Sequence, residues 1–459
     1  MRVGELGFWH RSTGGPPRPR PPLDGSLSAD VAIVGAGFTG LWTAYYLKKA
    51  DPSLDVIVLE SEFAGYGASG RNGGWIMGFC EGLPERYAGR GGEAAVFALQ
   101  RELIGTVDEI GGVIDREGIE ADYYKGGGLT VAVNPAQEKR LRSGVEHARR
   151  AWGLKESDLY LLDPEELESR VRVAGARCAS YTPHVARVHP ARLVRGLADV
   201  VENLGVTICE STRVGEIRPH EAIAERGTVT ARWVVRATEG YTASLRGQGR
   251  ELVPINSSMI VTEPLPDSAW EEIGWNGHEA IGDSANVYIY SQRTADGRIA
   301  IGGRGVPYRF GSRPDFGAEI ADTTVESLAE KLYSMFPAAA GAGIDHGWSG
   351  VIGVPRDWCV SVHADRESGL ARAGGYSGEG VAASNLAGRI LRDLLLDRKS
   401  DLTGLPWVGH RPPRWEVEPL RFAAIHSIYS LYGQADRFEA RTGRPSLLAR
   451  AIDLASGRH

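Results

Sequence analysis

The chain has 459 residues, of which 42% are hydrophobic, and a formal net charge of −6. This length exceeds one ordinary core and predicts two domains in a globular protein. A net negative charge without a basic arm gives no reason to expect nucleic acid as a partner, and no apolar stretch is long enough to span a membrane. Residues 1–26 have no signal-peptide core but many prolines, so we predict an extended arm on the body of a cytoplasmic protein.

The first predicted elements form one unit at residues 31–60. Residues 31–34 are an apolar run that predicts a buried strand, 41–50 predict a helix, and 56–59 predict a second buried strand. Glycines in GxGxxG spacing lie between the first strand and the helix, and an acid ends the unit: Gly35, Gly37, Gly40 and Glu60. In this context the spacing is typical of a dinucleotide-binding site.

Each residue of this motif has a physical role. Gly35 permits a tight turn, Gly37 lets backbone N–H groups approach a pyrophosphate, and Gly40 lets the helix pack closely on the strand. The helix N-terminus then faces the phosphate charge. Glu60 accepts hydrogen bonds from ribose hydroxyls, and its charge disfavours the 2′-phosphate of NADP.

A second glycine-rich loop, GYGASGRNGGW at 65–75, follows the acid after a few residues. A loop with so few side chains suits close backbone approach to a ligand, and Arg71 and Asn72 add directed donors. This favours FAD over a nicotinamide cofactor, with an NAD-dependent dehydrogenase as the weaker alternative.

The elements that follow alternate between helices and short strands. We predict strands at 124–133, 206–208, 232–237, 254–262, 286–291 and 298–302, and helices at 135–151, from 163, at 190–203, 321–336 and 381–396. The last part, 405–459, is proline-rich and then helical, with an apolar stripe (Leu420, Ile425, Ile428, Tyr429 and Tyr432) that predicts docking onto the body. The four cysteines are scattered without metal-ligand spacing, so we predict reduced thiols and no metal.

A third glycine-rich segment repeats the logic of the first. In ARAGGYSGEGVAASNLAGRIL at 371–391, a short apolar strand enters Gly374, a loop follows, and a helix begins at Val381. A helix N-terminus at this point stabilises negative charge on a bound group.

These segments resemble the D-amino-acid-oxidase-type family of FAD-dependent oxidoreductases, which includes glycine oxidase and sarcosine oxidase. The resemblance is strongest to its γ-glutamylputrescine oxidase-like branch. It is carried by VAIVGAGFTGLWTAYYL at 31–47, ASGRNGG at 68–74, RVHPARLVRGLA at 187–198, RWVVRATEGY at 232–241, IAIGGRG at 299–305 and the segment at 371–391.

The resemblance implies a mixed α/β fold with a Rossmann-like FAD-binding domain and an antiparallel-sheet substrate domain. We expect a discontinuous FAD-binding domain (27–115, 165–245 and 345–402), a substrate domain (116–164 and 246–344), a C-terminal helical extension (403–459) and the N-terminal arm (1–26). FAD is expected to be non-covalent, because Cys359, the candidate for a covalent link, lies in a segment that alternates like a strand.

Motifs and resemblance together give a set of residues expected to bind FAD: Gly35, Gly37, Phe38, Thr39, Gly40, Glu60, Ser61, Gly67, Ala68, Ser69, Arg71, Asn72, Gly73, Gly74, Val214, Thr238, Gly240, Gly375, Tyr376, Gly378, Glu379, Gly380 and Val381. In the family, the loop of the third glycine-rich segment (375–380) and the helix that follows it face the flavin ring. The chemistry expected there is oxidation of a C–N bond by hydride transfer to flavin N5, which gives an imine that hydrolyses.

Five residues are candidates for catalysis or substrate binding. Glu379 can hold a cationic amine, Arg304 can bind a carboxylate, His189 can hydrogen-bond substrate, and Tyr290 and Trp75 can form walls. Each also has a structural reading: a solvated loop acid, an ion pair, a helix cap, or core aromatics.

The positions at which sarcosine-oxidase-like enzymes carry basic carboxylate clamps hold Ala382 and, near the first loop, Gly74. Their absence argues against a sarcosine-like small amino acid as substrate, unless Arg304 or another arginine takes their place, and we expect an amine or amino-acid-like substrate. Oxygen or another acceptor takes the electrons, and the oligomeric state stays open. The alternatives are a tailoring flavoenzyme of the same fold and a non-catalytic flavin-binding protein.

Overall fold

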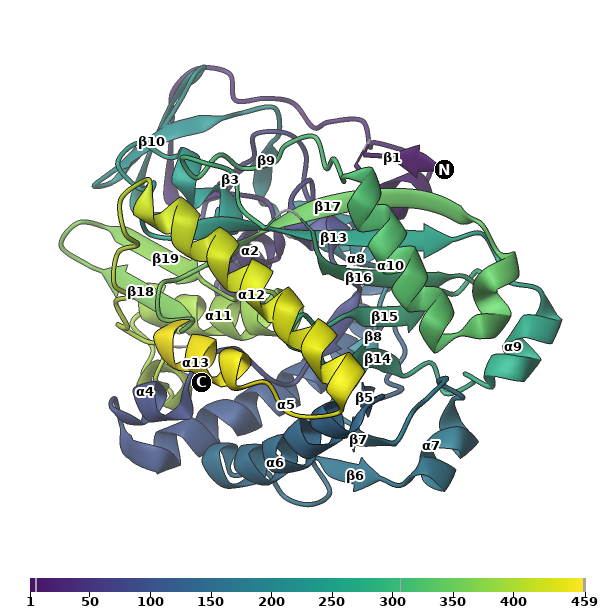
Figure 1. Ribbon diagram of the computed structural model, residues 1–459. Helices are drawn as coiled ribbons and strands as arrows, with labels where there is room; N and C mark the ends of the chain where they lie inside the picture. Colours follow the sequence, from purple (N-terminus) through teal and green to yellow (C-terminus); the bar gives the residue numbers. More distant parts are fainter. Residues whose placement is uncertain (5, 306, 457–459) are drawn as a thin grey trace.

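The computed structural model describes residues 1–4, 6–305 and 307–456, and two large sheets organise them (Figure 1). The first sheet has the order β10-β11-β12-β2-β3-β9, with β19 paired to β12 and β18 paired to β19. Its members are β2 (Leu27–Val34), β3 (Val56–Leu59), β9 (Thr207–Cys209), β10 (Val214–Arg218), β11 (Glu221–Ala224), β12 (Gly227–Arg236), β18 (Ser361–Asp365) and β19 (Leu370–Gly374).

The central strands of this sheet run parallel, so their carboxyl ends meet at one edge. Strand β2 is parallel to both β3 and β12, and β19 is parallel to β12. The residues that follow these strands, Gly35, Glu60, Ala237 and Gly375, therefore lie at one edge, where open parallel sheets bind ligands.

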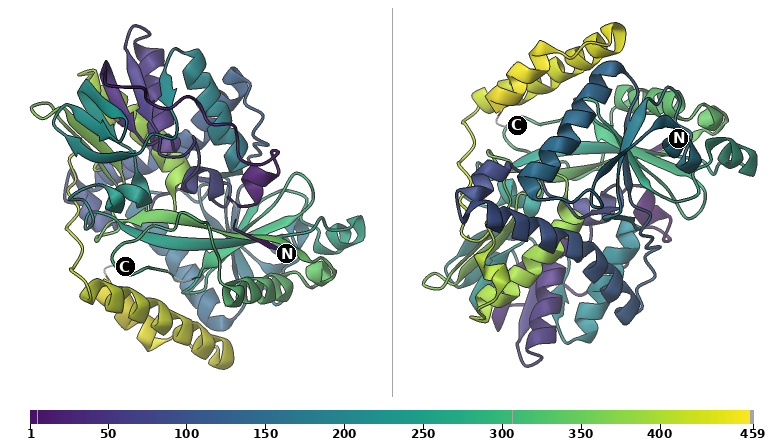
Figure 2. Two further views of the ribbon diagram at one scale, coloured as in Figure 1. Left: turned by 90° about the horizontal axis from the view of Figure 1, so that it is seen from above. Right: turned by 90° about the horizontal axis from the view of Figure 1, so that it is seen from below.

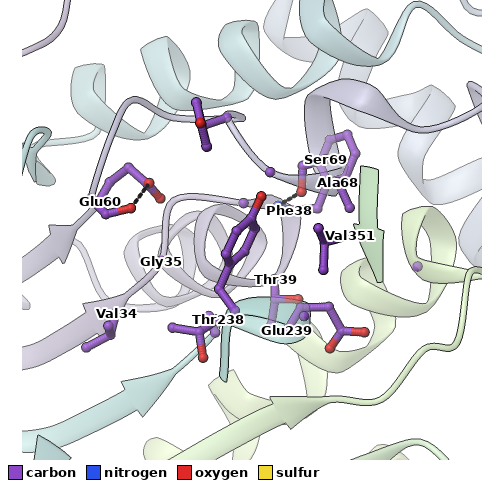
Figure 3. A pocket seen from close by; sticks show the side chains of 18 of the residues that line it. Val34, Gly35, Phe38, Thr39, Glu60, Ala68, Ser69, Thr238, Glu239 and Val351 are labelled. Atoms are coloured by element: carbon purple, nitrogen blue, oxygen red, sulfur yellow. Dashed lines mark hydrogen bonds between the residues drawn. The ribbon is translucent and has the colours of Figure 1, made fainter. Parts of the chain in front are cut away.

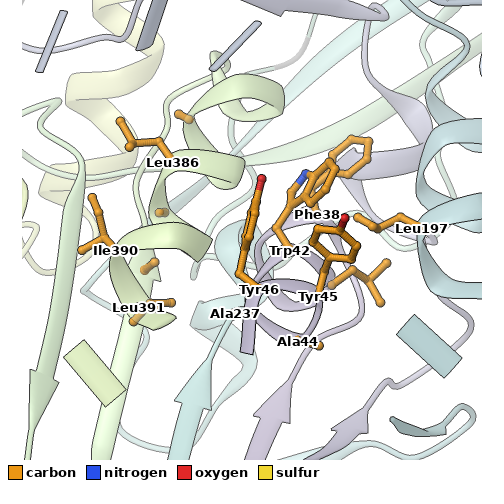
Figure 4. Close-up of a cluster of buried hydrophobic side chains, with 14 of the residues drawn as sticks. Phe38, Trp42, Ala44, Tyr45, Tyr46, Leu197, Ala237, Leu386, Ile390 and Leu391 are labelled. Atoms are coloured by element: carbon orange, nitrogen blue, oxygen red, sulfur yellow. The ribbon is translucent and has the colours of Figure 1, made fainter. Parts of the chain in front are cut away.

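Helices cover this sheet because its central strands are apolar on both faces. Helix α2 (Phe38–Ala50) packs against α11 (Gly380–Leu395), and Figure 4 shows Trp42 and Tyr46 of α2 beside Leu386 and Ile390 of α11. The approach is close because a Cβ on Gly388 would lie 2.9 Å from the backbone carbon of Trp42. Helices α5 (Gly92–Glu117) and α8 (Pro190–Asn203) complete this layer.

The second sheet has nine strands in the order β1-β17-β13-β16-β15-β14-β5-β7-β6, and most of its pairs are antiparallel. Its strands are β1 (Arg2–Val3), β5 (Gly128–Ala132), β6 (Tyr160–Leu162), β7 (Cys178–Thr182), β13 (Val253–Thr262), β14 (Ala280–Asp283), β15 (Tyr290–Arg293), β16 (Ile299–Arg304) and β17 (Ile344–Val354). Helix α10 (Asp322–Met335) lies against β13 and β16, and Figure 2 shows it on the side away from the first sheet. The predicted mixed α/β architecture is confirmed.

Smaller elements connect these layers. Strands β4 (Trp75–Met77) and β8 (Val185–Arg187) form a two-stranded ladder. Before the C-terminal extension, the remaining helices are α1 (Phe8–Arg11), α3 (Ala68–Arg71), α4 (Pro84–Ala88), α6 (Pro135–Trp152), α7 (Pro164–Arg170) and α9 (Asp267–Ile273), with 3-10 turns at Glu239–Ser244, Pro337–Gly341 and Asp401–Gly404.

Three details differ from the sequence-based expectations. Strands β7 and β17, which fall inside the segments 165–245 and 345–402, pair within the second sheet, because an apolar run does not reveal which sheet it joins. Cys359 lies in a loop between β17 and β18 and not in a strand. The N-terminal arm is extended over its prolines but also contains β1 and α1, which contact β17.

The C-terminal extension forms α12 (Leu420–Thr442) and α13 (Leu447–Ser456). In Figure 1, α12 runs diagonally across the front of the molecule, from the side of the first sheet to α6 and β5. Of the predicted stripe, Ile425 packs on the ends of β13 and β17, Tyr432 is buried mainly against α13, and Leu420 is 63% exposed. Among the described residues, no helix has the length and apolar character needed to cross a membrane.

Candidate functional site

The main pocket lies at the carboxyl edge of the first sheet, where the glycine motifs meet (Figure 3). Its lining includes most of the residues predicted to bind FAD: Gly35, Gly37, Phe38, Thr39, Glu60, Ser61, Gly67, Ala68, Ser69, Asn72, Val214, Thr238, Gly240, Tyr376, Gly378, Gly380 and Val381. Segments separated by more than three hundred residues thus form one site.

The first glycine turn is shaped so closely that side chains would not fit. Gly35 has φ of 108°, and a Cβ there would lie 2.6 Å from the carbonyl oxygen of Ala237. A Cβ on Gly37 would lie 2.8 Å from Oγ of Ser69, and that hydroxyl accepts a hydrogen bond from the Phe38 N–H at 2.8 Å. Ser69 thereby ties the second glycine-rich loop to the N-terminus of α2, and the backbone stays open to a bound phosphate.

Glu60 ends β3 and points back at this turn. Its carboxylate accepts hydrogen bonds from the N–H of Ala36 at 2.9 Å and from that of Glu62 at 3.1 Å. Burial raises the pKa of Glu60 above its ordinary value, while the two backbone donors favour the charged form. The acid is therefore fixed in position at the pocket, where it can accept hydrogen bonds from ribose hydroxyls.

The two glycine motifs are joined by side chains. Oγ1 of Thr39 lies 2.9 Å from the hydroxyl of Tyr376, which links α2 to the loop before α11. Glu239 accepts hydrogen bonds from the N–H groups of Gly375 at 2.9 Å and Tyr376 at 3.1 Å. Burial raises the pKa of Glu239 to about 7. This carboxylate therefore holds the loop at 375–380 against the end of β12.

Two buried groups beside the pocket have no hydrogen-bond partner among the residues that the structure describes. The hydroxyl of Tyr241, which lines the pocket, has none. The guanidinium of Arg71 is 2% exposed, and none of its three nitrogens has a hydrogen-bond partner there, although it stacks on the ring of Tyr66 at 4.3 Å. Unpaired buried polar groups are costly, so a polar ligand such as FAD fits this pocket.

Six predicted FAD residues do not line the main pocket: Gly40, Arg71, Gly73, Gly74, Gly375 and Glu379. Gly40 packs against the first turn, where a Cβ would lie 2.0 Å from the carbonyl oxygen of Gly35. The lining residues that sequence reasoning missed are Val34, Leu59, Tyr66, Thr212, Arg213, Ala237, Glu239, Tyr241, Ser244, Leu245, Phe316, Val351, Ile352 and Ser384. The sequence could have indicated Glu239 and Tyr241, because both lie within five residues of the carboxyl end of the parallel strand β12, where ligands bind.

Tyr290 and Trp75 lie together beside the second glycine-rich loop. Their rings meet edge to face with centroids 6.2 Å apart, and a Cβ on Gly73 would lie 2.7 Å from the Tyr290 ring. The hydroxyl of Tyr290 lies 2.9 Å from Oγ of Ser257 on β13. Tyr290 of the second sheet and Trp75 of β4 thus form an aromatic wall against the loop that continues from the pocket.

Three half-buried charged residues interact electrostatically and form what we call the charged cluster: Glu81, Arg304 and Glu379. None of their side chains has a hydrogen bond or ion pair within the described part of the chain. Burial and the nearby Glu81 raise the pKa of Glu379 to about 8, although Arg304 opposes the shift. Glu379 begins α11 between Gly378 and Gly380, which both line the main pocket. The cluster therefore adjoins the predicted flavin site with its charges unpaired.

His189 occupies a different environment. Its Nδ1 accepts the N–H of Arg192 and caps α8, its Nε2 lies 2.9 Å from Oγ of Ser12, and its ring packs on Trp9. Burial lowers the pKa of His189 to about 4. Both ring nitrogens thus have protein partners, and the residue is not part of the main pocket lining. The structure shows the helix-cap arrangement.

The Cys359 thiol is fully buried, and burial raises its pKa to about 11. It shares a cluster with Asp357 and His410, whose ligand atoms lie within 4.8 Å of one another. Nε2 of His410 already lies 2.8 Å from Asp357, which also accepts the N–H of Cys359. These contacts close the loop after β17, and the thiolate needed for reaction with flavin is disfavoured.

The parallel sheet, the glycine turn and the acid after β3 define a dinucleotide-binding enzyme of the FAD class. A comparison with family models agrees: residues 30–394 match the FAD dependent oxidoreductase (DAO) family. The chain belongs to this family, and it is an FAD-dependent oxidoreductase.

Individual relatives cover most of the chain. It is 30% identical over 436 residues to gamma-glutamylputrescine oxidoreductase of Escherichia coli, and the aligned region covers 90% of this chain and 94% of the relative. It is 31% identical over 405 residues to the probable oxidoreductase OrdL of Haemophilus influenzae, spanning 84% of this chain and 88% of the relative. The predicted family and branch are supported by these matches.

Solved structures show the same fold. Glycine oxidase from Geobacillus kaustophilus superposes with a TM-score of 0.69 at 21% identity, over 84% of this chain and 99% of its own. L-proline dehydrogenase from P. horikoshii gives a TM-score of 0.67 at 18% identity, over 83% and 98% of the two chains. The predicted two-domain arrangement of this family is thereby supported.

Proposed function

We propose that this protein oxidises a C–N bond of an amine or amino acid, with bound FAD as the electron acceptor. The observation that carries the proposal is the charged cluster. It places an acid and a guanidinium, both without an ion-pair partner in the described residues, next to the loop at 375–380. The name of the Escherichia coli relative, gamma-glutamylputrescine oxidoreductase, points to the same class of chemistry.

The residues expected to hold FAD are the glycine turn at 35–40 with Glu60 on the nucleotide side and the loop at 375–380 on the flavin side. When bound, FAD supplies a two-electron acceptor for the hydride of the carbon that bears nitrogen. The oxidised substrate is an imine, which water hydrolyses to a carbonyl compound and ammonia or an amine.

The chain's own residues bind and orient the substrate. Glu379 pairs with the substrate ammonium and takes up its proton, because only a neutral amine can release hydride. Arg304 binds an acidic group of the substrate bidentately. The Trp75–Tyr290 wall excludes water from the reacting carbon.

Oxygen is our proposed acceptor of the electrons from reduced flavin. The cytoplasm remains the proposed compartment, and its support is that all four cysteines are unpaired thiols.

The test is anaerobic spectroscopy of the purified holoprotein with a panel of amines and amino acids that includes γ-glutamylputrescine, putrescine and glycine. Bleaching of the flavin bands by one class identifies the substrate, and the rate at which colour returns in air separates an oxidase from a dehydrogenase. Flavin that stays oxidised with every compound would contradict the proposal.

A further inference from the structure

Among the contacts that hold helix α12 on the body, two lie on either side of Tyr429 and join the helix to segments of the second sheet. Near its start, Nε2 of His426 lies 2.9 Å from the carbonyl oxygen of Tyr308, in the segment that follows β16. Near its end, Asp436 accepts the backbone N–H groups of Asn286 at 2.8 Å and Val287 at 2.9 Å, just before β15. The part of α12 between these anchors therefore crosses the neighbouring ends of β15 and β16.

Those strand ends carry residues of the proposed substrate region. Strand β15 begins at Tyr290, β16 ends at Arg304, and the two strands are paired with Tyr290 opposite Gly302. Tyr429 lies one helical turn beyond His426, so the two side chains share a face of α12. Its ring is half-buried and packs with Ile425 against the cluster formed by the ends of β13 and β17.

The Tyr429 hydroxyl has no hydrogen-bond partner within the described ranges, and neither does the Arg304 guanidinium. Burial lowers the pKa of Arg304, but the neighbouring phenols, Tyr429 first among them, and Glu81 outweigh it and hold that pKa above its ordinary value. The backbone places the two groups together as well: Arg304 is the register partner of Ser257 on β13, and Ile255, two residues earlier on the same face of that strand, belongs to the cluster that Tyr429 packs against. A phenol and a guanidinium that lie near each other without hydrogen-bond partners can both donate to one anion.

We propose that Tyr429 and Arg304 together form a subsite for a carboxylate of the substrate, remote from the oxidised C–N bond, with α12 as its outer wall. This subsite rests on the proposed function, because Glu379 on the flavin side is the group that binds the amine. The fit is to an amino acid whose carboxylate points away from the flavin. Helix α12 lies beyond residue 394, where the match to the family model ends.

The experiment measures binding through the perturbation of the flavin absorption spectrum of the holoenzyme under anaerobic conditions. The probes are glycine, 4-aminobutyrate and 6-aminohexanoate, each paired with the amine that lacks its carboxylate: methylamine, propylamine and pentylamine. The variants are Tyr429→Phe, Arg304→Gln and the double variant. Tyr432→Phe is the matched control, because it also removes a hydroxyl group from α12. The Tyr432 hydroxyl donates to Asp453 of α13 at 2.6 Å and lies outside the proposed subsite.

For the amino acid that binds best, Tyr429→Phe should raise the Kd about tenfold or more, as expected for a lost hydrogen bond to a charged group. Arg304→Gln should raise it further, and the double variant should fall short of the product of the two effects, because the residues share one anion. Binding of the paired amine and all binding by Tyr432→Phe should stay within twofold of the wild type.

An equal effect of Tyr429→Phe on an amino acid and its paired amine would overturn the subsite, and so would an effect below twofold. The absence of saturable binding of all three amino acids to the wild type would overturn it as well. These outcomes differ from failure of the proposed function. Amines that bleach the flavin regardless of Tyr429 and Arg304 would refute the subsite alone, whereas carboxylate-dependent binding without bleaching by any amine would refute the oxidation.

Discussion

Glu239 is the residue whose replacement gives the sharpest test of how the flavin loop is held. Its two carboxylate oxygens accept separate backbone N–H groups, from Gly375 and Tyr376. Replacement by glutamine keeps the shape of the side chain but leaves one acceptor and no charge. The variant Glu239→Gln therefore resembles the protonated form of the wild-type residue.

The magnitude follows from the pKa of this group. Burial raises the pKa of Glu239 from 4.5 to about 7 in the folded protein, so between these values the folded state holds a proton that the unfolded chain has lost. The free energy of unfolding must then fall as pH rises through this window. At 1.36 kcal/mol per pKa unit, the loss attributable to Glu239 is about 3 kcal/mol.

The assay is urea unfolding of the holoprotein at pH 5 and pH 8, followed by tryptophan fluorescence. We expect the stability of the wild type relative to Glu239→Gln to decrease by about 2.5 kcal/mol between the two pH values, because a part of the total loss has already occurred by pH 5. Glu263→Gln is the control, since this carboxylate is exposed, and it should follow the wild type. Parallel pH curves for the wild type and Glu239→Gln would refute the argument that this buried acid titrates near neutrality.

Three further predictions follow from contacts in the site. Gly37→Ala should yield protein without FAD, because its Cβ would lie 2.8 Å from Oγ of Ser69. Gly105→Ala is the control and should keep FAD, because its Cβ would have nothing within 4 Å. The FAD content of both variants is measured by the absorbance at about 450 nm after purification. Binding of a cationic amine should tighten as pH rises toward 8, where the Glu379 carboxylate forms. In a titration of Kd against pH, the Kd of the wild type should therefore fall, and that of Glu379→Gln should not. Asp436→Ala should release one anchor of α12 and speed limited proteolysis of the C-terminal helices at least severalfold, while leaving FAD content unchanged.

Sequence reasoning succeeded where the chemistry depends on local backbone shape. The turn at Gly35 and Gly37 needs glycine at fixed spacing between a strand and a helix, and helix α8 begins and ends at the predicted residues, 190 and 203. The helix after the third glycine-rich segment's loop, α11, is predicted one residue late at each end: the prediction is 381–396 and the structure has Gly380–Leu395. Such elements are specified by residues that are neighbours in the chain.

The parts that could not be predicted depend on contacts between distant segments. Nothing near Tyr429 in the sequence indicates Arg304, because α12 is positioned by Asn286, Val287 and Tyr308, more than a hundred residues away. His189 lies in a motif of the family, yet Ser12 from the N-terminal arm engages its second ring nitrogen. The pairing of β17 within the second sheet could not be predicted for the same reason, since a strand's own residues do not specify its pairing partners.

The charged cluster also bears on how an amine could lose its proton to a carboxylate. An alkylammonium has a pKa near 10.4, so passing its proton to an ordinary carboxylate of pKa about 4.5 costs about 8 kcal/mol. With the pKa of Glu379 raised to about 8, the same transfer costs about 3 kcal/mol. Burial and the neighbouring Glu81 thus make Glu379 a better proton acceptor while it remains able to attract the cation. Arg304 opposes that shift, and a substrate carboxylate bound to Arg304 would remove part of this opposition. Binding of the distant acidic group would then favour the neutral amine at the other end of the same substrate.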